Sequence, residues 1–367
     1  MIAMYDIGII GGGPAGATLA RLVCSGRRVL LISNGRQKCC GGILAPEAQK
    51  LLAQLDLALP KSVLADPQPF AVTIIDAQSN LIKHYPRQYI NVNRNKFDQW
   101  LLSLLPASID FRQNAIYHKA ELSNNAENIT QDNYIDIHFS ENGKHQTAKV
   151  KWLVGADGGA SSVRNHFFKT SAKLKKYIAF QDWFDDNNVK IEPPTNMQYI
   201  NFHNNYVGIF DEKITDFYCW TIPKDGQLLI GGAIPITNNA RNNFEKLKSY
   251  LDSIGLKTNQ IKKKELALIT RPMSTSAINL GKNQILLAGE AAGLISPTSA
   301  EGVSFALASA TALANAFNSN KNVLLEYKKN TKNIIANIKL KYLKSPAMFN
   351  PHIRKFIMKS GLTALKK

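Results

Sequence analysis

The first part of the chain alternates short apolar runs with an amphipathic stretch, and this pattern predicts a strand, a helix and a second strand. Residues 4–10 form an apolar run that enters a glycine-rich turn, residues 14–25 show helical spacing, and residues 29–32 are apolar again. A strand followed by a helix and another strand usually belongs to a parallel sheet with helices on its faces. The chain therefore opens as an α/β domain.

Later segments alternate with a period of two, which predicts a second sheet. Residues 70–85 have the pattern of a hairpin, and residues 177–235 are strand-like, aromatic and interrupted by a Lys224-Asp225-Gly226 turn. Strands joined by such short turns are antiparallel. We also expect a meander around Asn142-Gly143, a polar loop over 123–133, a buried strand over 285–288, and helices over 47–55, 96–105, 241–253 and 301–317.

The two kinds of pattern interleave along the chain, so we expect discontinuous domains. The 367 residues, 45% of them hydrophobic, contain enough apolar material for such a core. The nucleotide-binding type of α/β domain would take residues 1–68, 92–168 and 271–325, the antiparallel domain residues 69–91 and 169–270, and a basic C-terminal helical segment residues 326–367.

Charge is the most unusual feature of the composition. Lys and Arg number 45 against 27 Asp and Glu, a net charge of +18, and residues 328–367 hold eleven basic residues and no acidic one. Basic helices with spaced apolar positions can lie on an anionic membrane surface, cover a substrate tunnel or remain a solvated helix pair. All three readings stay open, and nucleic acid is not an expected partner.

Other features exclude several classes of protein. No apolar run approaches the roughly 18 residues of a membrane-spanning helix. The four cysteines are too few for a disulfide framework, and the seven histidines show no metal-ligand spacing. No signal-peptide pattern precedes the first strand. We expect a metal-free cytoplasmic protein, with peripheral membrane contact as the alternative.

The glycine turn has the pattern Gly11-x-Gly13-x-x-Gly16, between a strand and a helix that opens with Pro14 and Ala15. The first glycine permits the turn, the second lets a pyrophosphate approach the backbone, and the third lets the helix pack on the strand. The positive end of the helix then faces the phosphates. This context predicts dinucleotide binding.

The acid expected at the end of the second strand, where it would bind a ribose, is replaced by Ser33. A single hydroxyl cannot accept two hydrogen bonds from the diol as a carboxylate does. Either the adenosine is held more loosely, or Asn34 or Arg36 contributes, or Ser33 only ends the strand.

Two further strings follow apolar strands. Asp157-Gly158 lies in the first, and the second runs from Gly289-Glu290 to Pro297 and Gly302, where a helix opens. A carboxylate at a strand end can hold the ribityl hydroxyls of a flavin, and a helix N-terminus favours negative charge on the reduced ring. The alternative is a strand-turn-helix with a buried glutamate, which is costly without a partner.

Together the three strings resemble the flavoprotein superfamily of p-hydroxybenzoate hydroxylase and, within it, the geranylgeranyl reductase-like branch. The resemblance covers about residues 5–310. It implies FAD, a glutathione-reductase-like FAD-binding Rossmann domain and a mostly antiparallel β-sheet substrate domain. It also places Arg94 at an arginine that touches the cofactor near its phosphates, the alternative being a solvated helix-cap arginine. Glu290 stands where an aspartate is usual.

Three residues are candidates for catalysis. Residues 38–42, Lys-Cys-Cys-Gly-Gly, are similar to a segment of the reductase branch and place Cys40 near the flavin, with plain packing as the alternative. Glu301 is either a proton donor or a helix acid favoured by the dipole. Tyr218 opens Tyr-x-Trp-x-Ile-Pro, which is similar to a signature of flavin-dependent halogenases and to a strand of the reductases, although the same spacing suits a core stripe.

The resemblance implies an enzyme, an FAD-dependent oxidoreductase that reduces a double bond of a hydrophobic, isoprenoid-type small molecule by hydride transfer from reduced flavin. No second glycine fingerprint is present, so NAD(P)H or another electron donor would dock transiently. The alternative is a flavin-dependent aromatic monooxygenase or halogenase acting through a peroxyflavin. A redox-silent flavin-binding module is the non-enzymatic alternative.

Overall fold

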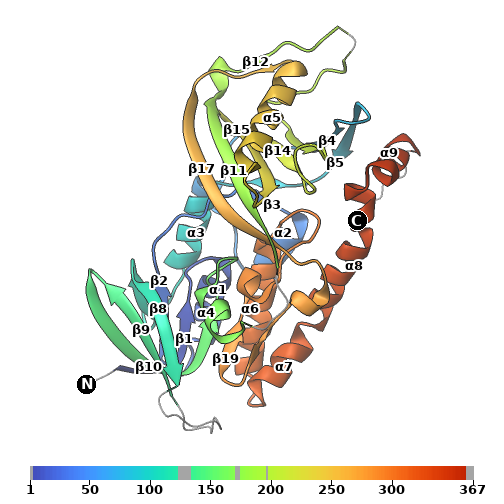
Figure 1. The fold of residues 1–367 in the computed structure, drawn as a ribbon. Coiled ribbons are helices and arrows are strands. Elements are labelled where there is room, and N and C mark those ends of the chain that lie inside the picture. The colour runs from blue at the N-terminus through green and yellow to red at the C-terminus, as the bar shows by residue number, and fades with distance from the viewer. Residues whose placement is uncertain (1–2, 123–133, 170–173, 196, 361–367) are drawn as a thin grey trace.

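The computed structural model describes residues 3–122, 134–169, 174–195 and 197–360. It contains two sheets, one below the other in Figure 1, with three C-terminal helices along one side. The polar loop expected over residues 123–133 lies outside the described residues. The architecture confirms the predicted fold class, an α/β nucleotide-binding fold combined with a mostly antiparallel sheet and C-terminal helices.

The first sheet is built around β1, whose residues become fully buried toward its carboxyl end. β1 pairs in parallel with β2 on one side and β10 on the other, and the order β18-β19-β10-β1-β2-β7 completes the layer. β8 and β9 extend β10 as the expected meander. The strands are β1 (Ala3–Ile10), β2 (Val29–Ser33), β7 (Asp110–Gln113), β8 (Ile116–Leu122), β9 (Ile135–Glu141), β10 (Lys144–Gly155), β18 (Gly281–Lys282) and β19 (Ile285–Leu287).

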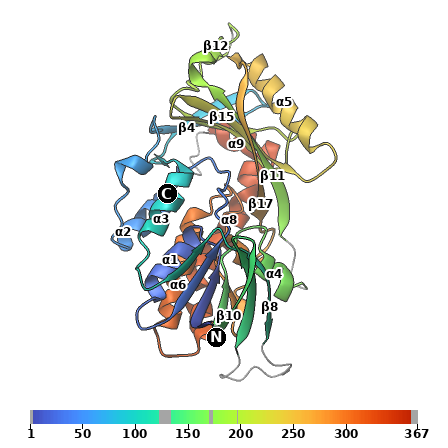
Figure 2. The same cartoon turned by 90° about the vertical axis from the view of Figure 1, so that its left-hand side faces the viewer.

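Helices cover this sheet because their apolar positions fall on one side. α1 and α6 pack on each other against the sheet, and their small residues join the largest hydrophobic core of the described chain. α2 and α3 lie together beside the junction of the two sheets (Figure 2). The helices of this part are α1 (Pro14–Val23), α2 (Pro46–Gln54), α3 (Arg94–Ser103), α4 (Ser162–Phe167) and α6 (Val303–Phe317).

Helix ends differ from the sequence-based expectation by a few residues, for local reasons. α1 stops at Val23 rather than at residue 25, and Gly26 then takes a left-handed φ of 68°. α3 starts at Arg94 because the Asn93 side chain accepts a hydrogen bond from the amide of Lys96 and caps it. α6 starts at Val303, after Gly302 at the cap position.

The second sheet has seven strands in the order β17-β11-β15-β14-β13-β4-β5. Every neighbouring pair is antiparallel except β13 and β4. α5 (Ala240–Ser253) covers one face through its buried Phe244 and Leu247, and Figure 2 shows it on the outer side. The strands are β4 (Ala71–Asp76), β5 (Leu81–Pro86), β11 (Lys175–Asp185), β13 (Tyr206–Phe210), β14 (Cys219–Lys224), β15 (Gln227–Pro235) and β17 (Ile261–Arg271).

Two small ladders connect the periphery. β3 (Ile43–Leu44) pairs with β6 (Ile90–Asn91), and β12 (Lys190–Ile191) pairs with β16 (Leu256–Lys257). The β3–β6 ladder ties the segment after the second strand to the entrance of α3, and so fixes the position of residues 38–42.

The C-terminal helices join the two sheets. α7 (Val323–Asn330) packs on α6, α8 (Lys332–Phe349) runs upward, and α9 (Pro351–Ser360) reaches β4 and β5 (Figure 1). The anchor is Arg354, which is 3% exposed and contacts Asp76 at 3.1 Å and Glu212 at 2.7 Å. Among the described residues, no helix is both long and apolar enough to cross a bilayer.

Candidate functional site

A cavity of about 690 Å³ lies between the two sheets, where β1, β2 and β10 end. In a parallel sheet the carboxyl ends of the strands share one edge, so the turns that follow them converge there. The cavity wall includes residues of all three glycine strings and of the second sheet. The predicted site residues in the wall are Gly11, Gly13, Pro14, Ala15, Ser33, Cys40, Arg94, Asp157, Gly158, Tyr218, Glu290, Glu301 and Gly302.

Three predicted residues stand outside this wall. Gly16 is buried inside α1, the Gly289 amide donates to Ser309 Oγ at 2.9 Å, and the Pro297 carbonyl accepts from Arg271 Nε at 2.8 Å. Their contacts shape the turns that carry the wall residues.

The glycines of the first turn have separate geometric roles. Gly11 has a φ of 113°, which only glycine adopts readily. A Cβ on Gly16 would lie 1.8 Å from the Gly11 carbonyl oxygen, so α1 can approach the turn only without a side chain there. A Cβ on Gly13 would meet nothing within 4 Å, and this residue lines the cavity. The open space above Gly13 and the positive end of α1 form a cradle for a phosphate group.

β2 ends at Ser33, at the edge of the cavity. Ser33 lines the wall together with Asn34 and Arg36. The Asn34 Oδ1 accepts a hydrogen bond from the Arg36 amide at 3.1 Å, which turns the chain along the cavity edge.

Asp157 is held by the start of α4. Its Oδ2 accepts from the Ser162 amide at 2.7 Å, and its Oδ1 accepts from Ser161 Oγ at 2.5 Å. Burial raises the pKa of Asp157 even though these hydrogen bonds oppose the shift. The carboxylate therefore orients the Asp157-Gly158 turn at the wall.

Tyr117 was not identified from the sequence. Tyr117 lines the cavity, and its hydroxyl is buried without a hydrogen-bond partner among the described residues. Burial, assisted by Asp157, raises the pKa of Tyr117, so the hydroxyl keeps its proton. A buried donor of this kind calls for a polar partner, which a ligand in the cavity can supply.

Glu290 is buried, and its partners are now identified. Its Oε2 lies 2.6 Å from Lys38 Nζ, and its Oε1 accepts at 3.0 Å from both the amide and the hydroxyl of Thr270. Burial alone would raise the pKa of Glu290, but Lys38 and Thr270 outweigh it and hold the pKa below its usual value. The side chain is thus an ionised, satisfied carboxylate in the wall, 252 positions from Lys38 in sequence.

Two basic side chains, Arg94 and Lys224, lie near Cys40. Arg94 Nε donates to Asp98 at 2.8 Å, and although burial opposes the charged form, Asp98 and Cys40 raise the pKa of Arg94. Lys224 is 5% exposed, donates to the Val92 carbonyl at 2.6 Å, and has its pKa lowered by burial to about 8. Arg94 therefore provides a permanent positive charge beside Cys40 at the cavity.

Tyr218 belongs to a pair of buried hydroxyls. Its hydroxyl donates to the Ser299 carbonyl at 2.7 Å and interacts with the hydroxyl of Tyr206, which the sequence did not indicate. Burial raises the pKa of both tyrosines, so both keep their protons. Trp220 and Ile222 line the cavity together with Tyr218. These three residues also belong to a buried hydrophobic cluster, so their alternating positions both form part of the core and face the cavity.

Glu301 has its oxygens engaged at the start of α6. It accepts from the Ser304 amide at 2.7 Å and from the Ser304 hydroxyl. Burial raises the pKa of Glu301, and Ser304 and Lys341 partly offset this. Its hydrogen bonds are those of a helix-capping acid, and its side chain still borders the cavity.

The donor set fits a long, anionic, aromatic ligand such as FAD. Gly13 and the N-terminus of α1 would receive the pyrophosphate, and residues 33–36 together with Tyr117 would surround the adenosine end. Ala300, Glu301 and Gly302 at the start of α6 would meet the flavin ring. No group of three potential metal ligands occurs among the residues that the structure describes.

Comparisons with known proteins identify the family of this chain. Residues 4–336 match the FAD binding domain family. Proteins named CbrA are 34% identical over 373 residues, covering 98% of this chain and 94% of the relative in Escherichia coli O6:H1 and 97% in Shigella sonnei.

Solved structures of flavoproteins share the fold. A geranylgeranyl bacteriochlorophyll reductase-like protein from Thermoplasma acidophilum has a TM-score of 0.73 at 18% identity, covering 98% of this chain and 100% of that one. The p-nitrophenol 4-monooxygenase PnpA from Pseudomonas putida DLL-E4 has a TM-score of 0.71 at 14% identity, covering 99% and 95%. The myxobacterial chondrochloren halogenase CndH has a TM-score of 0.66 at 17% identity, covering 100% and 92%. The chain belongs to the FAD binding domain family.

Proposed function

We propose that this enzyme reduces a carbon–carbon double bond of a hydrophobic, isoprenoid-type substrate. The observation that carries the proposal is the Tyr206–Tyr218 hydroxyl pair, which stays protonated in a cavity wall that Trp220 and Ile222 also line. A saturating addition needs one hydride and one proton, and this pair can supply the proton. The reductase-like neighbour supports the same class of reaction.

When bound, FAD in its reduced form would supply the hydride. Gly13 and the N-terminus of α1 would hold the pyrophosphate, and the apolar side chains of Trp220 and Ile222 would exclude water from the substrate end. Arg94 provides fixed positive charge beside Cys40. The proton on the Tyr218 oxygen passes to the second carbon of the double bond, and the Tyr206 hydroxyl can replace it.

We assign the proton donor by comparing the hydrogen bonds of three candidate side chains, Glu301, Tyr218 and Cys40. Both oxygens of Glu301 accept hydrogen bonds from Ser304 and cap a helix. Tyr218 donates only to a backbone carbonyl, that of Ser299, which a better acceptor can displace. Cys40 Sγ accepts a hydrogen bond from the Gly42 amide at 3.5 Å and interacts with the Arg94 guanidinium. Tyr218 is therefore the proton donor in this proposal.

The electron donor is proposed to dock transiently, as NAD(P)H or another carrier. The first glycine turn provides a dinucleotide cradle at the cavity, and FAD would fill it. A donor that binds only during flavin reduction would leave the substrate end free for an apolar molecule.

The test is anaerobic turnover of the FAD-loaded enzyme. The flavin is reduced with dithionite or NADPH, geranylgeraniol or its phosphate is added, and flavin reoxidation is followed by absorbance while the product is analysed by mass spectrometry. We expect reoxidation without oxygen and a product heavier by two hydrogens. Tyr218→Phe should slow reoxidation and alter its pH profile, while flavin binding persists. Tyr177→Phe changes a buried tyrosine of β11 outside the cavity wall and serves as the control.

A second candidate is an aromatic monooxygenase or halogenase. Trp220, Ile222 and Pro223 repeat a halogenase signature whose first tryptophan is replaced by Tyr218, and the folds of PnpA and CndH are similar to that of this chain. Reoxidation that requires oxygen, together with an oxygenated or halogenated product, would favour it. That result would refute the reductase proposal.

A further inference from the structure

The outward side of α8 is apolar along its centre. Ala336, Leu340, Leu343 and Ala347 follow one another at intervals of four, three and four residues, which places them on one side of the helix. Leu340 is 52% exposed and Leu343 is 66% exposed. The opposite side carries buried Ile338, which contacts the core. α8 therefore has two apolar sides, and only one of them is covered by the described chain.

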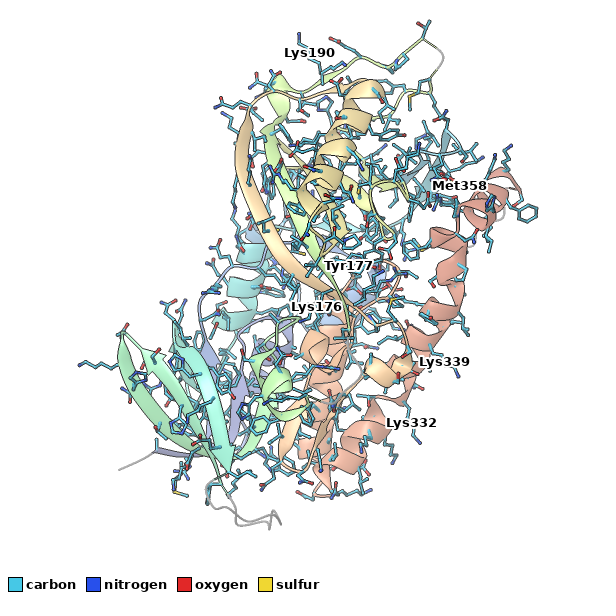
Figure 3. All side chains as sticks on the ribbon, in the orientation of Figure 1. Lys176, Tyr177, Lys190, Lys332, Lys339 and Met358 are labelled. Carbon is cyan, nitrogen blue, oxygen red and sulfur yellow. The ribbon has the colours of Figure 1, made fainter. Side chains whose placement is uncertain are left out.

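Lysines border this apolar ridge. Lys332 and Lys339 lie along one edge and Lys344 along the other, and Figure 3 shows Lys332 and Lys339 on the outer edge of α8. An ordinary solvated helix has its polar residues at the centre of the exposed side. Here the centre is apolar and the charges flank it, which is the arrangement of a helix that lies in a membrane interface.

α9 continues the same surface. Phe356 is 66% exposed and Ile353 is 42% exposed, with Lys355 and Lys359 exposed beside them. Neither helix contains an acidic residue. Within the described ranges, no carboxylate forms an ion pair with any of the five exposed lysines of α8 and α9.

The surface is held in place by contacts on its inner side. Arg354 is locked between Asp76 and Glu212 and stacks over Phe210, with 5.1 Å from its guanidinium carbon to the ring centroid. Phe349 packs against Phe217 with ring centroids 5.3 Å apart. The apolar outer side is thus exposed by a fixed part of the fold, so no ordering entropy of these helices opposes binding.

We propose that the outer surface of α8 and α9 docks the enzyme on an anionic lipid bilayer. The apolar ridge of Leu340, Leu343, Ile353 and Phe356 would enter the headgroup region, and the five lysines would meet anionic headgroups. A second copy of this chain fits poorly, because two such surfaces would bring unpaired lysines together. The inner side of α8 contributes Lys341 to the cavity wall, so the docking surface and the active site share one helix.

Vesicle sedimentation of the FAD-loaded enzyme tests this directly, and it does not depend on the reaction proposed above. Vesicles of phosphatidylcholine alone are compared with vesicles of phosphatidylcholine and phosphatidylglycerol in equal parts. We expect binding to the anionic vesicles, weakened by added salt, and little binding to the neutral ones. The bound flavin absorbance confirms that each variant is folded.

Paired variants separate the apolar and charged contributions. Leu340→Ser with Leu343→Ser should weaken binding by roughly tenfold per leucine. Lys339→Glu with Lys344→Glu should weaken it by at least about fivefold per lysine. Leu266→Ser is the matched control, because Leu266 is 63% exposed and belongs to β17 instead of α8 or α9.

Three outcomes would overturn the proposal. One is failure of the wild type to bind either kind of vesicle, and another is equal loss of binding in the Leu266→Ser control. The third is a wild-type dimer that the leucine variants convert to a monomer without any effect on vesicle binding, since the surface would then cover a second copy. A negative result in double-bond reduction would leave the vesicle measurements unaffected.

Discussion

We predict that replacing glycine by alanine in the turn at the cavity has different effects at two positions. At Gly13 the added methyl group should weaken FAD binding, and at Gly16 it should lower the stability of the protein. Gly13→Ala adds a Cβ that meets nothing within 4 Å, on a residue with φ −75° that alanine adopts without strain. Gly16→Ala adds a Cβ 1.8 Å from the Gly11 carbonyl oxygen. The first change intrudes only on the bound ligand, and the second intrudes on the protein itself.

The magnitudes follow from these contacts. The Gly13→Ala apoprotein should be as stable as wild type, or more stable by up to about 1 kcal/mol, because alanine restricts the unfolded chain. Its FAD dissociation constant should rise by roughly tenfold to a hundredfold if the methyl group removes one charge-assisted hydrogen bond of about 1.5–3 kcal/mol. The Gly16→Ala apoprotein should lose about 1–3 kcal/mol or more through over-packing.

Urea unfolding of the apoproteins measures their free energies of unfolding, and fluorescence titration with FAD measures the FAD dissociation constant. Comparing the two variants provides the control, because both replace a glycine of the same turn by alanine. Wild-type FAD affinity in Gly13→Ala would refute the placement of the phosphates over Gly13. An apoprotein of Gly16→Ala with wild-type stability would refute the packing argument.

Further predictions concern buried charge. Arg354→Met should lower the free energy of unfolding by about 3–5 kcal/mol in urea titrations, since it leaves buried carboxylates without their cation, whereas Arg241→Met, at an exposed ion pair, should change it by less than about 1 kcal/mol. The pKa of Lys224 falls from 10.5 to about 8 on folding, so the unfolded state binds more protons between these values. Raising the pH across that range should therefore stabilise wild type relative to Lys224→Met by about 3 kcal/mol, and a constant difference would contradict this. The pKa of Glu290 is lower in the folded state than its ordinary value of 4.5. Ionised Glu290 therefore stabilises the fold above pH 4.5, and this stabilisation is lost as the pH falls through the pKa of the folded state. In the Lys38→Met variant, burial should instead raise the pKa of Glu290. The difference in unfolding free energy between wild type and this variant should therefore become smaller as the pH falls, and thermal unfolding at several pH values measures it.

Much of the fold was predictable because its signals are local. The Gly11–Gly16 turn, the hairpin over residues 70–85 and the turn at Asp225-Gly226 each depend on residues close together in sequence. The backbone of these turns has the positive φ angles that such turns require, 113° at Gly11 and 51° at Asp225. Hydrophobic periodicity predicted many of the other elements with errors at helix ends, whereas β17 (Ile261–Arg271) and α4 (Ser162–Phe167) were not predicted.

The candidate site was predictable where a motif carries it and not where distant side chains meet. Lys38 was visible in its cysteine-containing segment, yet nothing local indicates that it pairs with Glu290, 252 positions later. Tyr206 and Tyr117 stand in strands whose sequences resemble many others, and only the folded sheets bring their hydroxyls to the cavity. The catalytic role of Tyr218 is a proposal, and the shared position of Cys40, Tyr218 and Glu301 in the cavity wall is what the structure adds.

The Arg354 clamp has a consequence for biosynthesis. Asp76 is almost completely buried, yet the cation that neutralises it lies 278 positions further along the chain. While the ribosome is still translating the intervening segment, the nascent seven-stranded sheet holds an unneutralised carboxylate and cannot reach its final packing. Stop codons upstream of position 354 should therefore yield a product that chaperones and proteases recognise as incompletely folded, rather than a trimmed but functional enzyme.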